Sequence, residues 1–140
     1  MYPAIPGWHC DAVPRSEKYA QPDLNLIRDD VRHFSCTVSD SLRGVCLTEF
    51  VETKEVEIDV DEQRVWRSVS QGVVAHGASI NTRSIPDGEI VSFGQNQLHR
   101  ATAAERPGWR FFFRLTTHPY PPKNEVRKQV QVYVDSGIGW

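Results

Sequence analysis

The amino-acid sequence predicts an all-β domain, a sandwich or a barrel with at most one or two short helices. Short stretches in which apolar and polar residues alternate recur along the chain, and they are rich in β-branched and aromatic side chains. Turn signals separate these stretches, and no long amphipathic helix of the kind that joins parallel strands is evident between them. The length of 140 residues and a hydrophobic content of 39% fit a single domain over residues 1–140.

The first half of the chain is expected to hold an irregular segment, a short helix and the first strands. Residues 1–22 are rich in proline. A short helix is expected after Asp23, whose carboxylate can cap it, with Leu24, Ile27 and Val31 on one face. Alternation predicts the next strands within two segments, HFSCTVSD (33–40) and GVCLTEFVETKEVEIDV (44–60).

The second half is expected to be strands joined by turns. Residues 63–80 predict two strands on either side of Gly72. Pro86-Asp87-Gly88 predicts a turn between the strands TRSI and EIVSF, because proline presets φ and glycine permits a positive φ. Two further strands are predicted, GWRFFFRLTTH (108–118) and QVQVYV (129–134).

The composition of the chain limits the binding partners and the cellular compartment that we expect. The net charge of −2 does not indicate nucleic acid as a partner, and the late basic residues are interpreted as a solvated segment: Lys123, Arg127 and Lys128. The sequence contains no run of about 18 apolar residues, so no membrane span is predicted. The N-terminus lacks the pattern of a signal peptide. The odd number and spacing of the cysteines predict free thiols in the reducing cytoplasm: Cys10, Cys36 and Cys46.

A histidine and a carboxylate stand two residues apart in PGWHCDAVPR. On an extended segment His9 and Asp11 would share one face, whereas Cys10 would point to the other and pack. Such a pair can hold a metal ion, or it can be a loop pair joined by a local hydrogen bond. His99 is the candidate third ligand because it follows EIVSF and the connection GQNQ; His76 is a rival, although no arginine follows it on an aromatic strand. His33 and His118 are interpreted as surface or packing residues. Trp8 and Trp109 could line a pocket, but they are interpreted as core or rim packing residues.

The strand predicted at 108–118 places two arginines on one face. Arg110 and Arg114 share that face with Phe112, and the opposite face would carry apolar side chains: Phe111, Phe113 and Leu115. A buried guanidinium needs an anion, because leaving it unpaired is costly. A carboxylate ligand can satisfy it through two parallel hydrogen bonds, and Glu89 of the chain is the alternative partner for Arg110.

The order of HxD, a strand followed by a histidine, and arginine on the next strand resembles the Fe(II)/2-oxoglutarate-dependent dioxygenases. LHRAT and ERPGWR look most similar to the phytanoyl-CoA hydroxylase and taurine dioxygenase branches, and the resemblance covers residues 6 to about 118. It implies a double-stranded β-helix, or jelly roll, in which His9, Asp11 and His99 hold Fe(II) as a facial triad. It also implies that Arg110 binds the distal carboxylate of 2-oxoglutarate and that Arg114 lies near the other end of this cosubstrate or near the substrate.

The activity that this resemblance implies is hydroxylation of a small-molecule substrate with release of succinate and CO₂. Two other classes stay open: a cupin-like metalloprotein that does not use 2-oxoglutarate, and a non-catalytic β-sandwich binding module. Eight residues precede His9, fewer than family members usually have, so the chain is a minimal member, takes a strand from QVQVYV or from a partner chain, or is a fragment. An incomplete sheet edge would favour a homo-oligomer.

Overall fold

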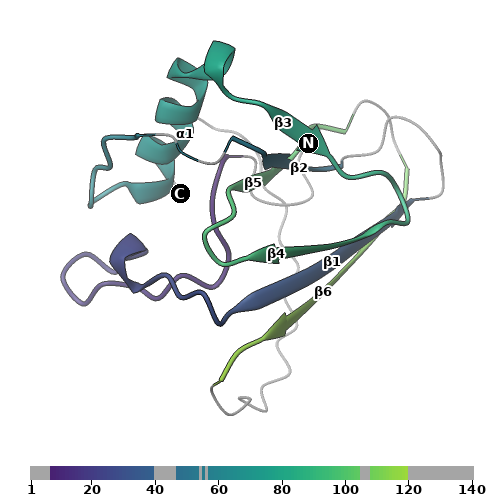
Figure 1. The fold of residues 1–140 in the computed structure, drawn as a ribbon, viewed down its shortest axis with the longest axis horizontal. Helices are drawn as coiled ribbons and strands as arrows, with labels where there is room; N and C mark the ends of the chain where they lie inside the picture. The colour runs from purple at the N-terminus through teal and green to yellow at the C-terminus, as the bar shows by residue number, and fades with distance from the viewer. Residues whose placement is uncertain (1–6, 40–46, 54, 56, 105–107, 120–140) are drawn as a thin grey trace.

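The computed structural model describes residues 7–39, 47–53, 55, 57–104 and 108–119. These residues form a mostly β structure with two small antiparallel sheets and one α-helix (Figure 1). The first sheet has the order β4-β1-β6, with strands Ile90–Gly94, Arg32–Ser39 and Arg110–Thr117. The second has the order β3-β2-β5, with strands Thr82–Ser84, Thr48–Val51 and His99–Ala101.

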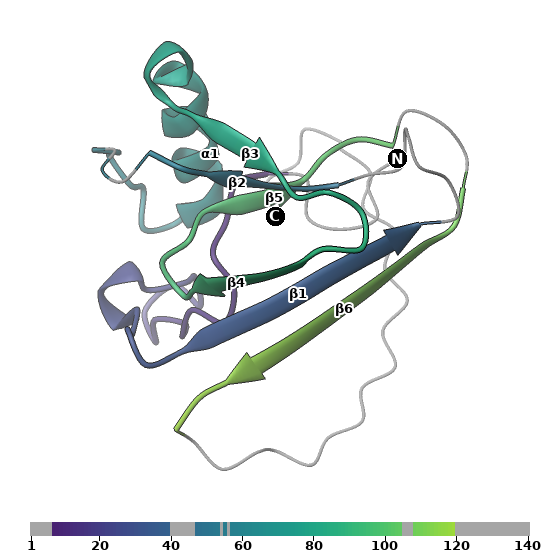
Figure 2. The same ribbon diagram turned by 45° about the vertical axis from the view of Figure 1, so that its right-hand side comes forward.

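The two sheets face each other across an aromatic contact. Figure 2 shows β2, β3 and β5 grouped above β4, β1 and β6. Phe50 of β2 packs edge-to-face on Phe93 of β4 with ring centroids 4.9 Å apart, and Ile85 completes this buried cluster. The face of β1 that lies on this side carries three buried polar side chains: His33, Ser35 and Thr37. The space between the sheets is therefore partly polar, which is unusual for a core and typical of a binding site.

Most of the predicted strands are confirmed. To within one residue, the alternating segments at 33–40, 44–60, 82–85, 89–93 and 108–118 contain β1, β2, β3, β4 and β6, whereas β5 was not predicted as a strand. The turn between β3 and β4 is also confirmed, with Gly88 at a φ of 80° that favours glycine. QVQVYV, Cys46 and the late basic residues lie outside the described residues.

The prediction of two strands within residues 63–80 is wrong, because this segment contains the helix α1, Val65–Ala75. Val65, Val69 and Val73 recur every four residues and are buried against Trp8 and Val51. Burial of this stripe against Trp8 and Val51 outweighs the β preference of valine.

The segment that precedes α1 also differs from its prediction. Residues 57–60 are not in a strand, and Ile58 and Val60 pack against the cluster around α1 instead. Gly72 lies at this contact, where an added Cβ would come within 2.5 Å of the Ile58 side chain. A glycine is therefore required by the close approach of the two segments and does not divide two strands.

The helix expected after Asp23 is reduced to a 3₁₀ turn. It spans Leu24–Leu26, and the carboxylate of Asp23 caps it by accepting a hydrogen bond from Asn25 N at 3.0 Å. Val31 is buried but lies outside this turn. The cap was therefore predicted correctly, whereas the length of the helix was not.

The outer face of β6 is not packed as expected. Among the described residues, three apolar side chains that should have been covered are at least half exposed: Phe111, Phe113 and Leu115. Trp109 is also exposed, against its interpretation as a packing residue, whereas Trp8 is buried as interpreted. In the described part of the chain, no helix has the length and apolar composition needed to cross a bilayer.

We predict that Val69→Ala lowers the free energy of unfolding by about 2 kcal/mol, because it leaves a cavity in the buried cluster that α1 forms with Trp8 and Val51. The matched control is Val74→Ala on the same helix, since Val74 is 70% exposed. That change should alter stability by less than about 0.5 kcal/mol. Urea denaturation of both variants measures the difference, and equal losses would contradict the burial of this helix face.

Candidate metal centre

A reciprocal pair of backbone hydrogen bonds joins the N-terminal segment to β5. His9 N donates to His99 O and His99 N donates to His9 O, each at 3.0 Å, as in an antiparallel bridge. Directly opposite residues of such a bridge project to the same face. The two imidazoles accordingly lie side by side, with ring centroids 4.6 Å apart.

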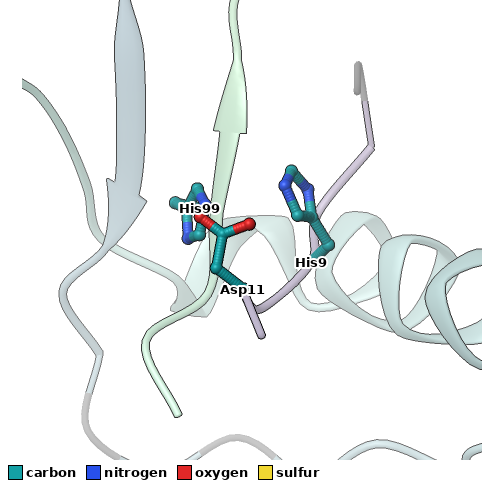
Figure 3. Close-up of side chains that lie close together, drawn as sticks. All are labelled: His9, Asp11 and His99. Carbon is teal, nitrogen blue, oxygen red and sulfur yellow. Dashed lines mark hydrogen bonds and ion pairs between the residues drawn. The ribbon is translucent and has the colours of Figure 1, made fainter. Parts of the chain in front are cut away.

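Asp11 completes the cluster because it lies two residues beyond His9 and returns to the same face. Figure 3 shows the three side chains meeting, His9 and Asp11 from the N-terminal segment and His99 from β5. One ligand atom from each lies within 4.8 Å of the others, and both histidines are buried. Asp11 Oδ2 is 3.1 Å from His99 Nε2. Two adjacent ligands about 2.1 Å from one ion lie about 3 Å apart, so this spacing fits a shared metal.

Each imidazole is oriented by a backbone carbonyl. His9 Nδ1 donates to Gly7 O at 2.8 Å, and His99 Nδ1 donates to Gln97 O at 3.0 Å. Because a carbonyl oxygen only accepts, Nδ1 must carry the proton, and Nε2 is the nitrogen that a neutral ring can offer to a metal. Partners of this kind fix the tautomer and the orientation of metal-binding histidines.

The contact between His99 and Asp11 requires a cation. With the proton of a neutral His99 on Nδ1, the lone pair of Nε2 would face an ionised carboxylate oxygen across 3.1 Å. Two acceptors at that distance repel each other. Either a second proton on the imidazole or a metal ion must lie between them, so the geometry contains a place for one positive charge.

Charges within the cluster keep Asp11 ionised. Burial raises the pKa of the Asp11 carboxyl, but hydrogen bonds and charges from His99 and Arg114 outweigh it and hold that pKa well below its usual range. Arg114 Nη1 donates to Oδ2, the same oxygen that faces His99. A carboxylate that is ionised at neutral pH is the form that binds a metal ion.

The pKa shifts of His9 and Cys10 suit these two residues to different roles. Burial and the nearby positive charge of His99 lower the pKa of His9 from 6.5 to about 4, so His9 is neutral at pH 7 and able to coordinate. Burial and the charge of Asp11 raise the pKa of Cys10 to about 12. Cys10 is buried as predicted, and its neutral thiol packs rather than coordinates.

The two arginines of β6 have different hydrogen-bond partners. Arg114 contacts the cluster through Asp11. Arg110 lies farther along the strand and donates to Thr37 Oγ1 of β1 at 3.3 Å and to Thr48 Oγ1 of β2 at 3.4 Å. Its guanidinium thus connects the two sheets, and Glu89, the alternative partner, is exposed.

The remaining histidines fall into two groups. His76 is exposed at the end of α1 and outside the cluster, so it is not the third ligand. His33 is fully buried next to the cluster, with Nδ1 2.9 Å from Thr116 Oγ1 and its ring 5.1 Å from that of Phe93, which contacts His99. Among the described residues Nε2 of His33 has no hydrogen-bond partner. Local alternation gave no signal for its burial, because it would turn the apolar Phe34, Cys36 and Val38 inward, whereas the structure buries the polar face of β1.

Two glutamines that the sequence reasoning passed over support the cluster. Gln95 and Gln97 belong to the turn GQNQ before His99, and Gln97 supplies the carbonyl that orients the imidazole.

Comparison with protein-family models, with curated proteins and with solved structures finds no match for this chain. The functional proposal therefore depends on the geometry of this chain and on the family resemblance of its motifs.

We predict that the metal-free protein loses stability as the pH falls from about 6.5 towards 4. Protonation of His9 is disfavoured in the fold, where its pKa is about 4 instead of 6.5. Between these values the unfolded chain binds more protons, so the stabilisation is complete above the upper pKa and is lost on acidification, by about 3 kcal/mol.

Urea denaturation of chelator-treated protein at a series of pH values measures this loss. His9→Gln removes the titrating group and should reduce the slope over the same interval. An unchanged slope in that variant would show that His9 is not the group responsible.

Proposed function

We propose that this protein is an Fe(II)- and 2-oxoglutarate-dependent oxygenase that hydroxylates a small molecule. The observation that carries the proposal is the buried meeting of His9, Asp11 and His99, with both imidazoles tied at Nδ1 and able to coordinate through Nε2. Two imidazoles and one carboxylate are the donor set of non-haem Fe(II) oxygenases. No thiolate takes part, which distinguishes the cluster from the usual structural zinc sites.

The arrangement of the sheets supports a jelly roll as the finer description of the fold. Two antiparallel sheets face each other, and the chain passes from β4 in the first to β5 in the second through the turn that carries Gln95 and Gln97. In the proposed fold His9, Asp11 and His99 would hold the metal. Arg110 and Arg114 both project from β6 into the space between the sheets.

The residues around the cluster suit a dicarboxylate cosubstrate. Bound Fe(II) supplies the activation of O₂ and the oxidation of 2-oxoglutarate to succinate and CO₂. Asp11 and the two neutral histidines hold the ion with a single negative charge. Arg110 supplies a permanent positive charge between the sheets, where it can bind the distal carboxylate with the hydroxyls of Thr37 and Thr48 beside it.

One contact favours a second candidate, a cupin-like metalloprotein that does not use 2-oxoglutarate. Arg114 is already bound to Asp11, so one of the two arginines needs no external anion. In such a protein Arg110 would serve only to join the sheets through Thr37 and Thr48. Binding of 2-oxoglutarate separates the two candidates.

We predict that anaerobic titration of the protein with Fe(II) and then with 2-oxoglutarate produces the visible charge-transfer band of a chelated keto acid. The band should saturate at about one equivalent, and His99→Ala should abolish it.

Arg110→Gln should leave Fe(II) binding unchanged and raise the 2-oxoglutarate concentration for half-saturation by about ten- to a hundredfold, because a charge-assisted contact is lost. Arg83→Gln is the matched control, since Arg83 is an exposed arginine of β3 that pairs with Glu52.

The possible outcomes of this titration are distinct. Iron binding without the band would contradict the use of 2-oxoglutarate and support the cupin-like candidate. Absence of iron binding would overturn the metal site itself. Equal effects of the Arg110 and Arg83 variants would remove Arg110 from the binding of the cosubstrate.

A further inference from the structure

The side chain of Gln95 connects three segments that are distant in the sequence. It follows β4, is 3% exposed, and uses both ends of its amide. Its Oε1 accepts from Arg28 N at 2.7 Å, and its Nε2 donates to Ala12 O at 2.6 Å. Because one partner is a donor and the other an acceptor, the orientation of the amide is determined.

The residue that Gln95 holds is in an unfavourable conformation. Ala12 has a φ of 57°, in the left-handed region that favours glycine. It directly follows Asp11, so this turn sets the direction in which the chain leaves the metal cluster. A strained backbone persists only where its surroundings hold it, and such positions gather at functional sites. Here the side-chain amide of Gln95 donates a hydrogen bond to the backbone oxygen of Ala12.

The same turn also orients the opposite side of the cluster. Gln97 O accepts the Nδ1 proton of His99 at 3.0 Å, and Gln97 Nε2 donates to Val51 O at 2.5 Å. Residues 95–97 therefore contact both the backbone that follows Asp11 and the imidazole of His99, although these two ligands are 88 residues apart in the sequence.

We propose that Gln95 is a positioning residue of the metal centre: it holds Ala12 in its left-handed conformation and thereby keeps the carboxylate of Asp11 turned towards His99. This inference rests on the proposed metal-binding function. Gln95 does not touch the metal, so its effect is exerted through the backbone that follows Asp11. Loss of the amide donor should weaken metal binding even where the fold is retained.

The test is a titration of the full chain with Co(II), followed by visible absorption, which reports coordination without cosubstrate or turnover. Gln95→Glu at pH 8 keeps the size of the side chain and can still accept from Arg28 N, but it places a carboxylate against the carbonyl of Ala12. We expect the Co(II) affinity to fall by about ten- to a hundredfold, as for other partners that orient metal ligands. If this variant does not fold, Gln95→Met replaces it.

Three control variants separate positioning from stability. Gly88→Ala strains the turn between β3 and β4, where Gly88 has a φ of 80°, so it destabilises the fold away from the cluster and should keep the Co(II) affinity of the unaltered protein. Ala12→Gly removes the strain, so the loss caused by Gln95→Glu should be smaller in that background, because glycine adopts this conformation without help. Ala20 is the other non-glycine residue with positive φ in the described part of the chain, at 53°, and Ala20→Gly should give no such rescue.

The results distinguish this inference from the proposal on which it rests. Equal Co(II) affinity of Gln95→Glu and the unaltered protein would overturn the role of Gln95 and leave the metal centre intact. Equal rescue by Ala12→Gly and Ala20→Gly would show that the effect does not pass through Ala12, and would also overturn the inference. No Co(II) binding by the unaltered protein would overturn both the centre and the positioning role.

Discussion

The candidate site depends on the reciprocal backbone bonds between His9 and His99. They attach the N-terminal segment to β5, which in turn pairs with β2. His9 and His99 therefore belong to one hydrogen-bonded layer. The alternation of side chains then places Asp11 beside the imidazoles and Cys10 on the opposite face. A shift of this bridge by one residue would bring a thiol to the position of an imidazole and would turn both ligands away.

Around that bridge, backbone groups do most of the positioning. Carbonyls of Gly7 and Gln97 set the two rings, and the amide of Gln95 sets the turn after Asp11. Besides His99, Asp11 contacts Arg114, whose guanidinium is permanently charged. A divalent ion would share Asp11 with this guanidinium, so metal binding and the position of Arg114 are coupled through Coulomb repulsion. A bound anion that draws Arg114 away from Asp11 would therefore strengthen metal binding.

Local patterns were sufficient to predict much of this arrangement. Alternation identified the strands of the first sheet, Pro-Asp-Gly identified the turn between β3 and β4, and the HxD spacing identified two members of the cluster. The helix α1 was misread because valine favours strands, although the spacing of Val65, Val69 and Val73 is that of a helix face. Gln95 could not be found in this way, since its partners lie 67 and 83 residues away. Contacts of that range depend on the tertiary fold and leave no periodic signal in the sequence.

The central claim, that both imidazoles coordinate one metal ion through Nε2 while Nδ1 donates to a carbonyl, can be tested by proton NMR of the Co(II)-loaded protein. The account predicts two strongly shifted exchangeable resonances, one from each Nδ1 proton, that disappear in deuterated water. His9→Gln and His99→Gln should each remove one of them. Absence of shifted exchangeable resonances when Co(II) is bound would contradict the account, because the histidines would then not be the ligands that the geometry describes.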